Sequence, residues 1–405
     1  MPVGLEGLKV IEMGQMVAVP MASRLLGDFG ADVIHIEHPI RGDTGRTVQT
    51  AAARRVGLPV EDIVPYIWEH YNRNKRGMTL DVSQEEGQQL LYKMVGTADV
   101  FLTNMRPFEI ERYHLDYKTL SKLNPRLIYA SLTGLGKNGA DKNVPSYDHT
   151  IYWARAGFSH RLAAKGMAIS GQVGAFGDNI AAMVMAYGIM TALYIRETTG
   201  VGQEVDISLL NTGIYHDSWD VTGALITGRD IQMPDWSESG ALLTCYQTKD
   251  GRWLRVGFVL PDRYWARFCQ AIGREDLEND PRFDSTQTKA QNNAALLDIL
   301  KDVFKGKTLA EWKERLGNDI PWAPVQTIPE VCQDPQARQN GAFIQYDHPS
   351  YGPMELVANP VMLSKTPSGV NMPAPEFSQH TEEILLDYGY TWEDIAGFKE
   401  KGVIA

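Results

Sequence analysis

The first forty residues alternate between strand and helix patterns, and this alternation constrains the fold of the 405-residue chain more than any other feature. Leu8–Glu12 and Val33–Glu37 are short apolar runs typical of buried strands. Pro20–Phe29 between them has helical spacing and ends at Gly30. A strand, a helix and a strand within about 30 residues form a parallel β-α-β unit, which is normally right-handed. The chain therefore begins a parallel sheet.

The alternation continues as far as residue 208. Helical patterns recur at Gln84–Thr97, Thr119–Leu123 and Gly177–Arg196. We therefore predict an α/β fold in which helices cover an open parallel sheet. Its further strands are expected at Val100–Leu102, Arg126–Leu132 and Glu204–Ser208.

The pattern changes after about residue 225, where short strands alternate with amphipathic helices. Strands are expected at Leu242–Gln247 and Trp253–Val259, and a helix is expected at Ala294–Phe304. The pattern of residues 226–330 therefore predicts a separate, smaller α+β domain.

The charge balance disfavours one broad class of function. Lysine and arginine number 39 and aspartate and glutamate number 50, so the formal net charge is −11. A protein that binds duplex nucleic acid normally carries a basic surplus. We therefore expect no nucleic-acid partner.

Cysteine and histidine spacing gives no sign of a metal site. Cys245, Cys269 and Cys332 lie far apart, and none of the nine histidines forms an H-x-x-x-H pair. The N-terminus does not read as a secretory signal, and the apolar segment Ala181–Tyr194 is shorter than the ~18 residues that a membrane span needs. We therefore expect a cytoplasmic protein with neither a metal ion nor a membrane partner.

A formal G-x-G-x-x-G motif at Gly134–Gly139 does not predict a dinucleotide site. It follows an expected strand, but residues 140–145 do not open a helix. The first β-α turn, Met13–Ala18, lacks the glycine triplet that lets the backbone approach a pyrophosphate. We interpret Gly134–Gly139 as a polar loop.

A group of basic residues stands out in a chain with a negative net charge. Point charges and guanidinium forks of this kind suit a polyphosphate or a phosphorylated nucleotide. From charge alone, a solvated loop is the favoured interpretation. The group comprises Arg73, Lys75, Arg76, Arg106, Arg112 and Lys137.

Asp178 is a candidate for covalent chemistry. It follows Gly177 at the start of a strongly apolar helix pattern. A carboxylate there can be a simple helix N-cap, which satisfies a free backbone N–H. It can also be a partly dehydrated nucleophile or base, steadied by the positive end of the helix dipole. Taken alone, the residues favour the cap.

Short segments along nearly the whole chain connect these observations. Each is weak by itself, but in this order they resemble the class III CoA-transferase family, which includes formyl-CoA, carnitine and aryl-lactate CoA-transferases. The segments are Leu5–Glu12, Leu26–Glu37, Asn74–Arg76, Ala98–Val100 with Asn104, Leu123–Ser131, Gly134–Gly136, Gly177–Asp178, Thr199–Gln203, Pro321–Val325 and His380–Thr381.

The resemblance implies that Asp178 is the nucleophile, because it matches the catalytic aspartate of the family. Its carboxylate would attack the donor thioester to give an aspartyl acyl anhydride, and the released CoA thiolate would then form an aspartyl-CoA thioester. The acceptor carboxylate would reverse these steps. No tightly bound cofactor is implied, since coenzyme A enters as a CoA-ester substrate such as succinyl-CoA.

The resemblance also implies which residues contact CoA. Lys75, Arg76 and Arg112 are the expected partners of its phosphates, and Tyr147 and Asp148 are expected beside the nucleophile. The full set is Met16, Val17, His38, Asn74, Lys75, Arg76, Asn104, Met105, Arg112, Lys137, Tyr147 and Asp148.

Three departures from formyl-CoA transferase bear on the substrates. His38 replaces a CoA-contacting arginine, which puts that contact in doubt. Met233–Gly240 lacks that enzyme's glycine-rich loop, which argues against oxalate, and the insertion Ala51–Ile67 would shape a larger acid pocket. The expected acceptor is an aryl-substituted succinate or a 2-hydroxy acid.

Two alternatives share the same expected fold. A 2-methylacyl-CoA racemase uses an aspartate at this helix and a histidine in a Gly-His-Asp context, but here Tyr147 stands at the histidine position and His149 lies two residues late. The chain could also be one subunit of a heteromeric CoA-transferase.

The resemblance changes the expected domain organisation. It implies a large Rossmann-like, CoA-binding domain built from residues 1–225 and from the returning tail 331–405, with the small domain 226–330 between them. Two such chains interlock like rings in this family. We therefore expect acyl-CoA and a carboxylic acid as substrates, and a homodimer or a heteromer with a related subunit.

Overall fold

The computed structural model describes residues 4–163, 169, 173–233 and 235–405, so residue 234 of the segment Met233–Gly240 lies outside the description. The chain divides into two compact units. The large unit takes the chain up to Ser159, a central part that ends at Arg229, and Gln339–Ala405. The small unit contains Asp230–Arg338 and a short segment that begins at His160. It thus starts and ends a few residues later than the expected range 226–330.

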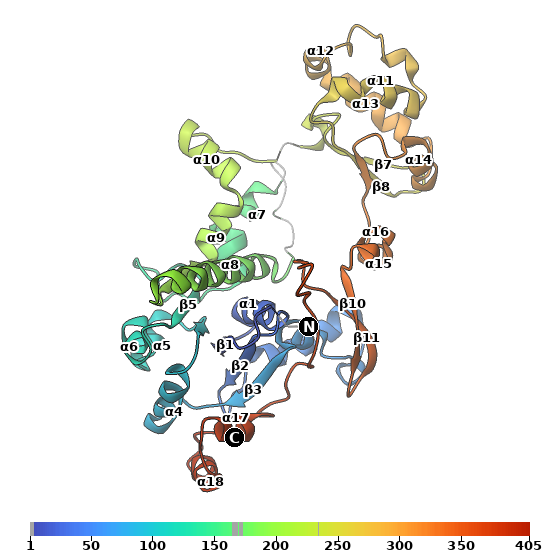
Figure 1. The fold of residues 1–405 in the computed structure, drawn as a ribbon. Coiled ribbons are helices and arrows are strands. Elements are labelled where there is room, and N and C mark those ends of the chain that lie inside the picture. Colours follow the sequence, from blue (N-terminus) through green and yellow to red (C-terminus); the bar gives the residue numbers. More distant parts are fainter. Residues whose placement is uncertain (1–3, 164–168, 170–172, 234) are drawn as a thin grey trace. The chain divides into compact units, whose positions relative to one another are not determined.

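The large unit is built on a six-stranded parallel sheet with the order β3-β2-β1-β4-β5-β6 (Figure 1). This is the strand order of doubly wound dinucleotide-binding sheets, whose ligand crevice lies at the carboxyl ends of the strands where the order reverses. Here that point falls between β1 and β4. The predicted α/β fold with an open parallel sheet is confirmed. The strands are β1 (Lys9–Met13), β2 (Asp32–Glu37), β3 (Lys75–Thr79), β4 (Val100–Thr103), β5 (Ile128–Thr133) and β6 (Glu204–Ser208).

Strand β3 is the one strand of this sheet that the hydrophobic pattern did not predict. Its sequence, KRGMT, begins with two basic residues and contains a glycine. Lys75 is nevertheless completely buried, because its charge is paired with an acidic residue of β1. The neighbouring strands therefore decide that this segment is a strand, and its own apolar content does not.

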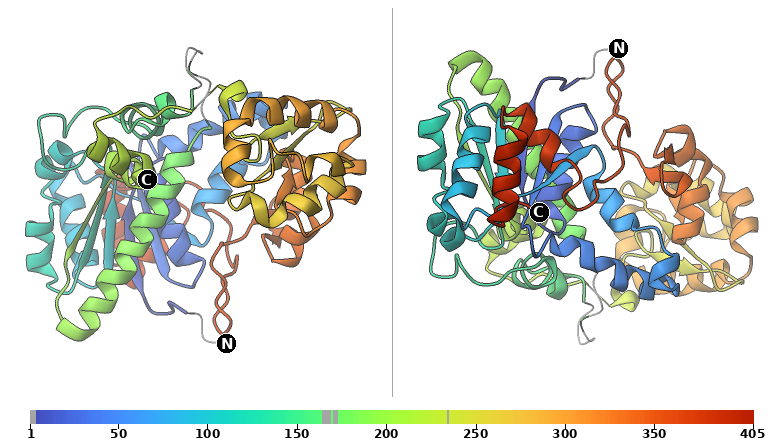
Figure 2. Two further views of the ribbon diagram at one scale, coloured as in Figure 1. Left: turned by 90° about the horizontal axis from the view of Figure 1, so that it is seen from above. Right: turned by 90° about the horizontal axis from the view of Figure 1, so that it is seen from below.

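Helices cover both faces of the sheet (Figure 2). Alternate strand residues, such as Val10 and Val33, pack into one core with α1 (Ala18–Gly27) and α8 (Phe176–Thr199). Their neighbours, such as Ile11 and Ile34, face a second core. That core contains residues of α4 (Glu85–Val95), α6 (Tyr117–Leu123), α17 (Thr381–Asp387) and α18 (Trp392–Glu400).

Helix α8 carries the candidate nucleophile and has two different sides. By length and composition alone, it could cross a membrane. Ala181, Met185 and Ile189 are fully buried in the core with α1 and the sheet. The other side exposes an apolar stripe that includes Tyr187 and Tyr194. One side of the helix therefore belongs to the protein core.

The remaining elements of the large unit connect these layers. They are η1 (Thr44–Val48), α2 (Gln49–Val56), η2 (Val60–Asp62), α3 (Tyr66–Asn72), α5 (Pro107–Arg112), the π-helix η3 (His149–Arg155), α7 (Phe158–Arg161, which continues into the small unit's first segment), α9 (Leu209–His216), α10 (Ser218–Thr227) and the antiparallel pair β10 (Phe343–His348) and β11 (Gly352–Val357).

The small unit is an α+β arrangement with a core of its own. Its three antiparallel strands have the order β7-β8-β9. Buried aromatic residues such as Phe268, Phe304 and Trp312 fill the space between strands and helices. The elements are η4 (Trp236–Glu238), β7 (Cys245–Gln247), β8 (Trp253–Val256), α11 (Pro261–Ile272), η5 (Glu275–Leu277), α12 (Thr286–Gln291), α13 (Asn293–Phe304), α14 (Leu309–Leu316), β9 (Trp322–Pro324), α15 (Ile328–Gln333) and α16 (Pro335–Gln339).

Candidate active site

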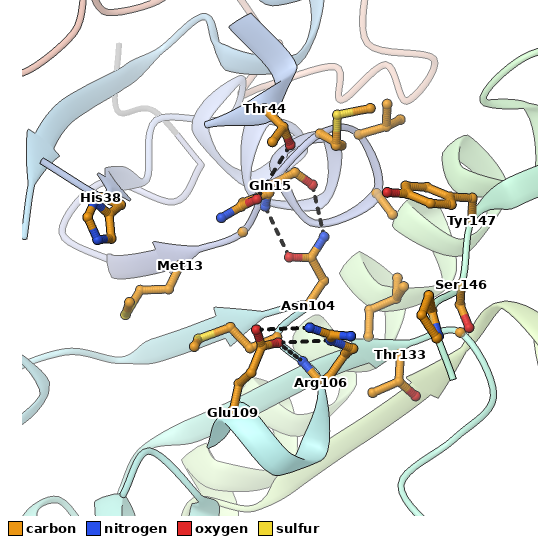
Figure 3. Close-up of a pocket in the computed structure, with 18 of the residues that line it drawn as sticks. Met13, Gln15, His38, Thr44, Asn104, Arg106, Glu109, Thr133, Ser146 and Tyr147 are labelled. Atoms are coloured by element: carbon orange, nitrogen blue, oxygen red, sulfur yellow. Dashed lines mark hydrogen bonds and ion pairs between the residues drawn. The ribbon is translucent and has the colours of Figure 1, made fainter. Parts of the chain in front are cut away.

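A cavity of about 570 Å³ lies in the large unit, at the carboxyl ends of the parallel strands (Figure 3). Segments that follow β1 to β5 form its walls, and α8 contributes Asp178. This is the crevice that the strand order predicts. The wall segments are Met13–Ala18, Ile36–His38, Leu80–Ser83, Asn104–Pro107 and Leu132–Gly134.

Asp178 is not the N-cap of α8, which corrects the capping interpretation. The helix begins at Phe176, so Asp178 is its third residue, and the N-cap position belongs to Ala175. The capping bonds come from Asp148 instead. Its carboxylate accepts hydrogen bonds from the backbone N–H groups of Gly177 and Asp178, the latter at 3.2 Å. The Asp178 side chain is therefore not needed as a cap.

Gly177 permits this close approach. A Cβ atom at position 177 would lie 2.1 Å from Cγ of Tyr152 and 2.5 Å from Oδ1 of Asp148. Both distances are far below van der Waals contact, so only glycine lets the ring and the carboxylate reach the start of α8. The glycine of the Gly177-Asp178 motif thus has a steric reason.

The environment shifts the protonation of both carboxyl groups. Burial, assisted by the nearby negative charge of Asp148, raises the pKa of Asp178 to about 7. Burial also raises the pKa of Asp148, although its hydrogen bonds to the helix start act in the opposite direction. Near neutral pH, Asp178 is thus divided between its acid and carboxylate forms, and a carboxyl group in this state is suited to act as a nucleophile or a base.

Aromatic side chains pack around the start of α8. The Tyr152 ring stacks on Phe158 with ring centres 4.8 Å apart, and Phe176 stacks on His216 at 6.2 Å. The Tyr152 hydroxyl also makes a hydrogen bond with Nδ1 of His216. The π-helix η3 supplies Tyr152 one turn after Asp148, and insertions of this kind are frequent at functional sites.

Asn104 joins the ends of β1 and β4 across the crevice (Figure 3). Its Oδ1 accepts the backbone N–H of Gln15 at 3.0 Å, and its Nδ2 donates to the carbonyl of Gln15 at 2.9 Å. The next residue, Met16, has a positive φ of 69° and donates its N–H to Asp43. The β1–α1 turn is therefore held from two sides.

Three cations line the cavity. Arg106 pairs with Glu109 at 3.3 Å, and Lys142 lies 3.6 Å from Glu111. Within the described part of the chain, Arg41 makes no ion pair. Of these cations, Arg41 is the one free to meet an anionic ligand.

His38 also lines the cavity. Its Nδ1 accepts the backbone N–H groups of Ile40 and Arg41, which fixes the turn after β2. Burial and the charge of Arg41 lower the pKa of His38, so its imidazole is neutral at pH 7. It therefore offers a hydrogen bond in place of a charge.

The cavity brings together most of the residues that the resemblance implied: Asp178, Met16, Val17, His38, Asn104, Met105, Tyr147 and Asp148. The expected set omitted Gln15, Arg41, Thr44, Thr133 and Lys142, which also line it, and the basic group had included Arg106. No motif marks the omitted residues. The rule that loops after parallel strands line the crevice could have pointed to Arg41, which follows β2.

Two expected phosphate contacts lie elsewhere, which corrects the prediction for them. Nζ of Lys75 is buried and donates to Glu12, to the carbonyl of Pro20 and to Asn72 at 2.8–2.9 Å. All three N–H groups of the Lys75 ammonium therefore already have acceptors within the protein, and none is free to bind a CoA phosphate. Arg76 does not line the cavity.

Arg76 instead binds acidic residues on the edge of the sheet. It pairs with Asp32 at 2.8 Å, with Asp387 at 2.8 Å and with Glu383 at 3.2 Å. Its pKa is raised, because these carboxylates outweigh the effect of burial. The residue thus fastens α17 to the sheet.

The other three expected contacts are also absent from the cavity wall. The Asn74 side chain accepts the N–H groups of Asn371 and Met372 and so holds the returning tail. Lys137 pairs with Glu204 at 2.7 Å. Arg112 is exposed and lies over the ring of Tyr113, which does line the cavity.

A doubly wound sheet whose crevice holds a carboxyl group with a raised pKa is typical of an enzyme. The chain belongs to CoA-transferase family III, whose model matches residues 5–381. The resemblance found in the sequence is thereby confirmed, and with it the enzyme class.

Curated relatives match over nearly their whole lengths. The chain is 33% identical to the (R)-2-hydroxy-4-methylpentanoate CoA-transferase of Clostridioides difficile, over 99% of both chains. It is 33% identical to the cinnamoyl-CoA:phenyllactate CoA-transferase of Clostridium sporogenes, over 96% of this chain and 94% of that one. It is 29% identical to the succinyl-CoA–L-malate CoA-transferase beta subunit of Chloroflexus aurantiacus, over 99% and 98%.

Solved structures show the same fold. A CAIB/BAIF family protein from Brucella suis superposes with a TM-score of 0.80 at 26% identity, over 96% of this chain and 100% of that one. Rv3272 from Mycobacterium tuberculosis gives a TM-score of 0.79 at 25% identity, over 93% and 97%.

Proposed function

We propose that this CoA-transferase moves CoA from an acyl-CoA, such as succinyl-CoA, to a 2-hydroxy carboxylic acid, with Asp178 as the nucleophile. The observation that carries the proposal is the half-buried Asp178 carboxyl, whose pKa is about 7 and which opens into a cavity at the carboxyl end of the sheet. Such a group is ionised often enough to attack a thioester near neutral pH.

The acceptor class is supported by what the similar enzymes act on. The acids in the three names, 2-hydroxy-4-methylpentanoate, phenyllactate and malate, all carry a hydroxyl group beside the carboxylate. They differ in the rest of the molecule. We therefore propose that the acceptor is a 2-hydroxy acid, and the substrate test below is designed to identify the rest of the acceptor molecule. The test includes an aryl-substituted succinate as the alternative acceptor.

The proposed reaction uses Asp178 twice. Its carboxylate oxygen attacks the thioester carbonyl and the C–S bond breaks. CoA leaves as a thiolate, and a mixed anhydride between Asp178 and the donor acid remains. The thiolate then attacks the Asp178 carbonyl and releases the donor acid, which leaves an aspartyl-CoA thioester. The acceptor carboxylate attacks the carbonyl of this thioester, and its C–S bond breaks to give a second mixed anhydride and the CoA thiolate. The thiolate attacks the acceptor's carbonyl in this anhydride, so the acceptor leaves as its CoA ester and the Asp178 carboxylate is regenerated.

The cavity wall would hold CoA during these steps. We propose that Arg41, Arg106 and Lys142 meet its phosphates, together with the first turn of α1, which faces the cavity at Val17 and Ala18. Backbone N–H groups at a helix start and guanidinium forks both suit phosphate oxygens.

A panel of donors and acceptors tests this proposal. Succinyl-CoA and acetyl-CoA are each incubated with 2-hydroxy acids, aryl-succinates and oxalate, and transfer is followed by mass spectrometry. We expect transfer to a 2-hydroxy acid, and trapping of the intermediate by hydroxylamine at Asp178. Asp178→Asn is expected to lose at least about 10³-fold in activity and to keep CoA binding. Intact transfer with an unmodified Asp178 would refute the mechanism.

The racemase alternative requires a second base. Tyr147 stands at that position and its side chain is exposed. Solvent deuterium that enters the α-carbon of an acyl-CoA, without any acceptor acid, would support a racemase. We expect none.

We also propose that a second copy of the chain covers the exposed apolar side of α8–α10, in the interlocked dimer that the resemblance implies. Tyr187, Tyr194, Tyr215 and Trp219 are each more than 70% exposed, which is uncommon for so many large aromatic residues on one set of helices. Light scattering should give twice the chain mass of 45.2 kDa. A stable monomer would contradict the dimer, and activity only with a related subunit would favour the heteromer, as the beta subunit relative suggests.

A further inference from the structure

A row of charged residues crosses three neighbouring strands of the parallel sheet. Glu12 on β1, His35 on β2 and Lys75 on β3 are all completely buried, and Glu12 and His35 face each other in the strand register. Oε2 of Glu12 lies 2.9 Å from Nζ of Lys75, and its Oε1 lies 3.0 Å from Nδ1 of His35. The reaction proposed above uses none of these three side chains.

The other side of the His35 ring faces two more acidic residues. Nε2 lies 3.7 Å from Oδ2 of Asp43 and 4.0 Å from Oε1 of Glu37. Arg46 already binds Glu37 with two hydrogen bonds of 2.6 and 2.8 Å. Within the described residues, Oδ2 of Asp43, Oε1 of Glu12 and both ring nitrogens of His35 are buried and make no hydrogen bond of regular geometry. The ring therefore meets these carboxyl groups at ion-pair distances, through charge. The His35 ring is thus the nearest source of positive charge for Asp43.

Asp43 in turn shapes the wall of the cavity. Its Oδ1 accepts the backbone N–H of Met16 at 2.9 Å and that of Gly45 at 2.6 Å. Met16 lines the cavity in a left-handed conformation with a φ of 69°, which costs a non-glycine residue of order 1 kcal/mol. The two hydrogen bonds of Asp43 therefore hold a turn that would otherwise relax.

With its three carboxyl groups ionised, the charges in this cluster balance when His35 is protonated. Burial raises the pKa of Asp43, whereas the charge of His35 and the backbone N–H groups of Gly45 and Met16 act to keep it ionised. Glu12, Glu37 and Asp43 supply three negative charges, whereas Lys75 and Arg46 supply two positive ones. The third cation in contact with the cluster is the imidazolium of His35. A buried carboxylate without a counter-charge is strongly disfavoured.

We infer that His35 is a positioning residue for the CoA ester: its imidazolium links Glu12 to Asp43 and thereby fixes the β1–α1 turn that lines the cavity. This inference rests on the proposal that the cavity binds CoA. The inference goes beyond that proposal, because it makes the affinity of the cavity for the CoA ester depend on protonated His35, a side chain that does not contact the substrate.

The protonation equilibrium agrees with this arrangement. Burial acts to lower the pKa of His35, but attraction to Glu12 and Glu37 outweighs it and raises the pKa above the ordinary 6.5. Since the folded pKa is the higher one, the stabilisation is complete below pH 6.5 and is lost as the pH rises through the folded pKa. The KM for the CoA ester should rise over the same range.

Nuclear magnetic resonance of the whole protein, labelled at the histidine Cε1 carbons, tests the protonation directly. His70 is a matched internal reference, because burial and two nearby arginines lower its pKa to about 3. At pH 7 we expect the His35 signal at the imidazolium position and the His70 signal at the neutral position. His35→Lys or His35→Gln assigns the signal. A neutral His35 at pH 7 would overturn the inference.

Kinetics with three variants test the positioning role. His35→Gln should raise the KM for the acyl-CoA about tenfold, the effect of losing one charged contact, with little change in kcat. His35→Lys keeps a cation and should restore a low KM that no longer rises with pH. His70→Gln is the control and should behave as the wild type. Equal losses of kcat in both His35 variants would indicate a merely structural role and overturn the inference.

Calorimetric titration with CoA separates this inference from the proposed function. If the wild type binds CoA and Arg41→Ala weakens binding, the cavity assignment stands, and unchanged binding by His35→Gln would refute the inference alone. If Arg41→Ala binds CoA as the wild type does, the cavity assignment itself fails.

Discussion

At the scale of single residues, the two carboxyl groups that meet at the start of α8 have different roles. Asp148 accepts the N–H groups of the helix start, and Asp178 remains available for reaction. The sequence points to Asp178 through the Gly-Asp motif, but it does not show which carboxyl group caps the helix. That distinction depends on Asp148, 30 residues earlier in the chain.

The pH dependence of the reaction follows from these two groups. The proposed nucleophile is the ionised form of Asp178, so kcat/KM should rise with pH through an apparent pKa near 7, the value set by burial and by Asp148. Asp148→Asn removes the neighbouring charge and should move this limb about one unit lower. Asp141→Asn is the control, because its exposed carboxylate pairs with Arg155. An unchanged limb in Asp148→Asn would contradict the assignment.

The same shift predicts the stability of a variant. Because the folded pKa of Asp178 is raised, its ionisation destabilises the folded state as the pH rises from about 4 through 7. Asp178→Asn should therefore raise the melting temperature at pH 8 by a few degrees and leave it nearly unchanged at pH 4. Scanning fluorimetry measures the melting temperatures. An equal change in melting temperature at the two pH values would contradict the raised pKa of Asp178.

Gly177 gives a sharper steric test. Gly177→Ala places a Cβ against Tyr152 and Asp148, so we expect a loss of about 1–3 kcal/mol in unfolding free energy and a fall of about 10²-fold in kcat. Gly174→Ala, three residues earlier and just before α8, is the matched control, since a Cβ there meets only the His149 ring at 3.9 Å. Denaturant unfolding and single-turnover kinetics measure both quantities. An active, stable Gly177→Ala would show that the start of α8 has room to move.

At the scale of elements, the edge strand β3 shows how a charged sequence can be structural. Lys75 and Arg76 alternate along the strand, and each ends among carboxylates on its own side of the sheet. From the sequence the same two residues suggested a solvated loop or a phosphate site. Partners from distant segments decide between these roles, and for Lys75 the partner is 63 residues away.

Two arginine variants should therefore behave in opposite ways. Arg76→Ala breaks the network with Asp32, Glu383 and Asp387, and should lower the unfolding free energy by about 1 kcal/mol with an unchanged KM for the CoA ester. Arg41→Ala should raise that KM about tenfold with unchanged stability. Chemical denaturation and initial rates distinguish the two. A raised KM for the CoA ester in Arg76→Ala would show that Arg76 contributes to CoA binding after all.

At the scale of the whole molecule, the small unit has a hydrophobic core of its own. We expect the fragment 230–338 to fold alone and to melt cooperatively, because buried aromatic residues from both its helices and its strands close its core. Trp312→Ala removes a ring that is 1% exposed and should cost about 3–5 kcal/mol, enough to unfold such a fragment. Circular dichroism provides the measurement. A fragment without a cooperative transition would show that the small unit depends on the rest of the chain.

The amino-acid sequence alone predicts the α/β class, five of the six strands of the parallel sheet and the Gly177-Asp178 motif. These features are local: apolar periodicity marks strands and helices, and a short ordered motif marks the family. The tertiary structure decided which carboxylate caps α8, which cations are already paired and which are free, and that β3 is a strand. These features depend on which residues, distant in the sequence, come into contact in the folded chain. The partner of a buried charge determines whether that charge stabilises the fold or is free to bind a ligand.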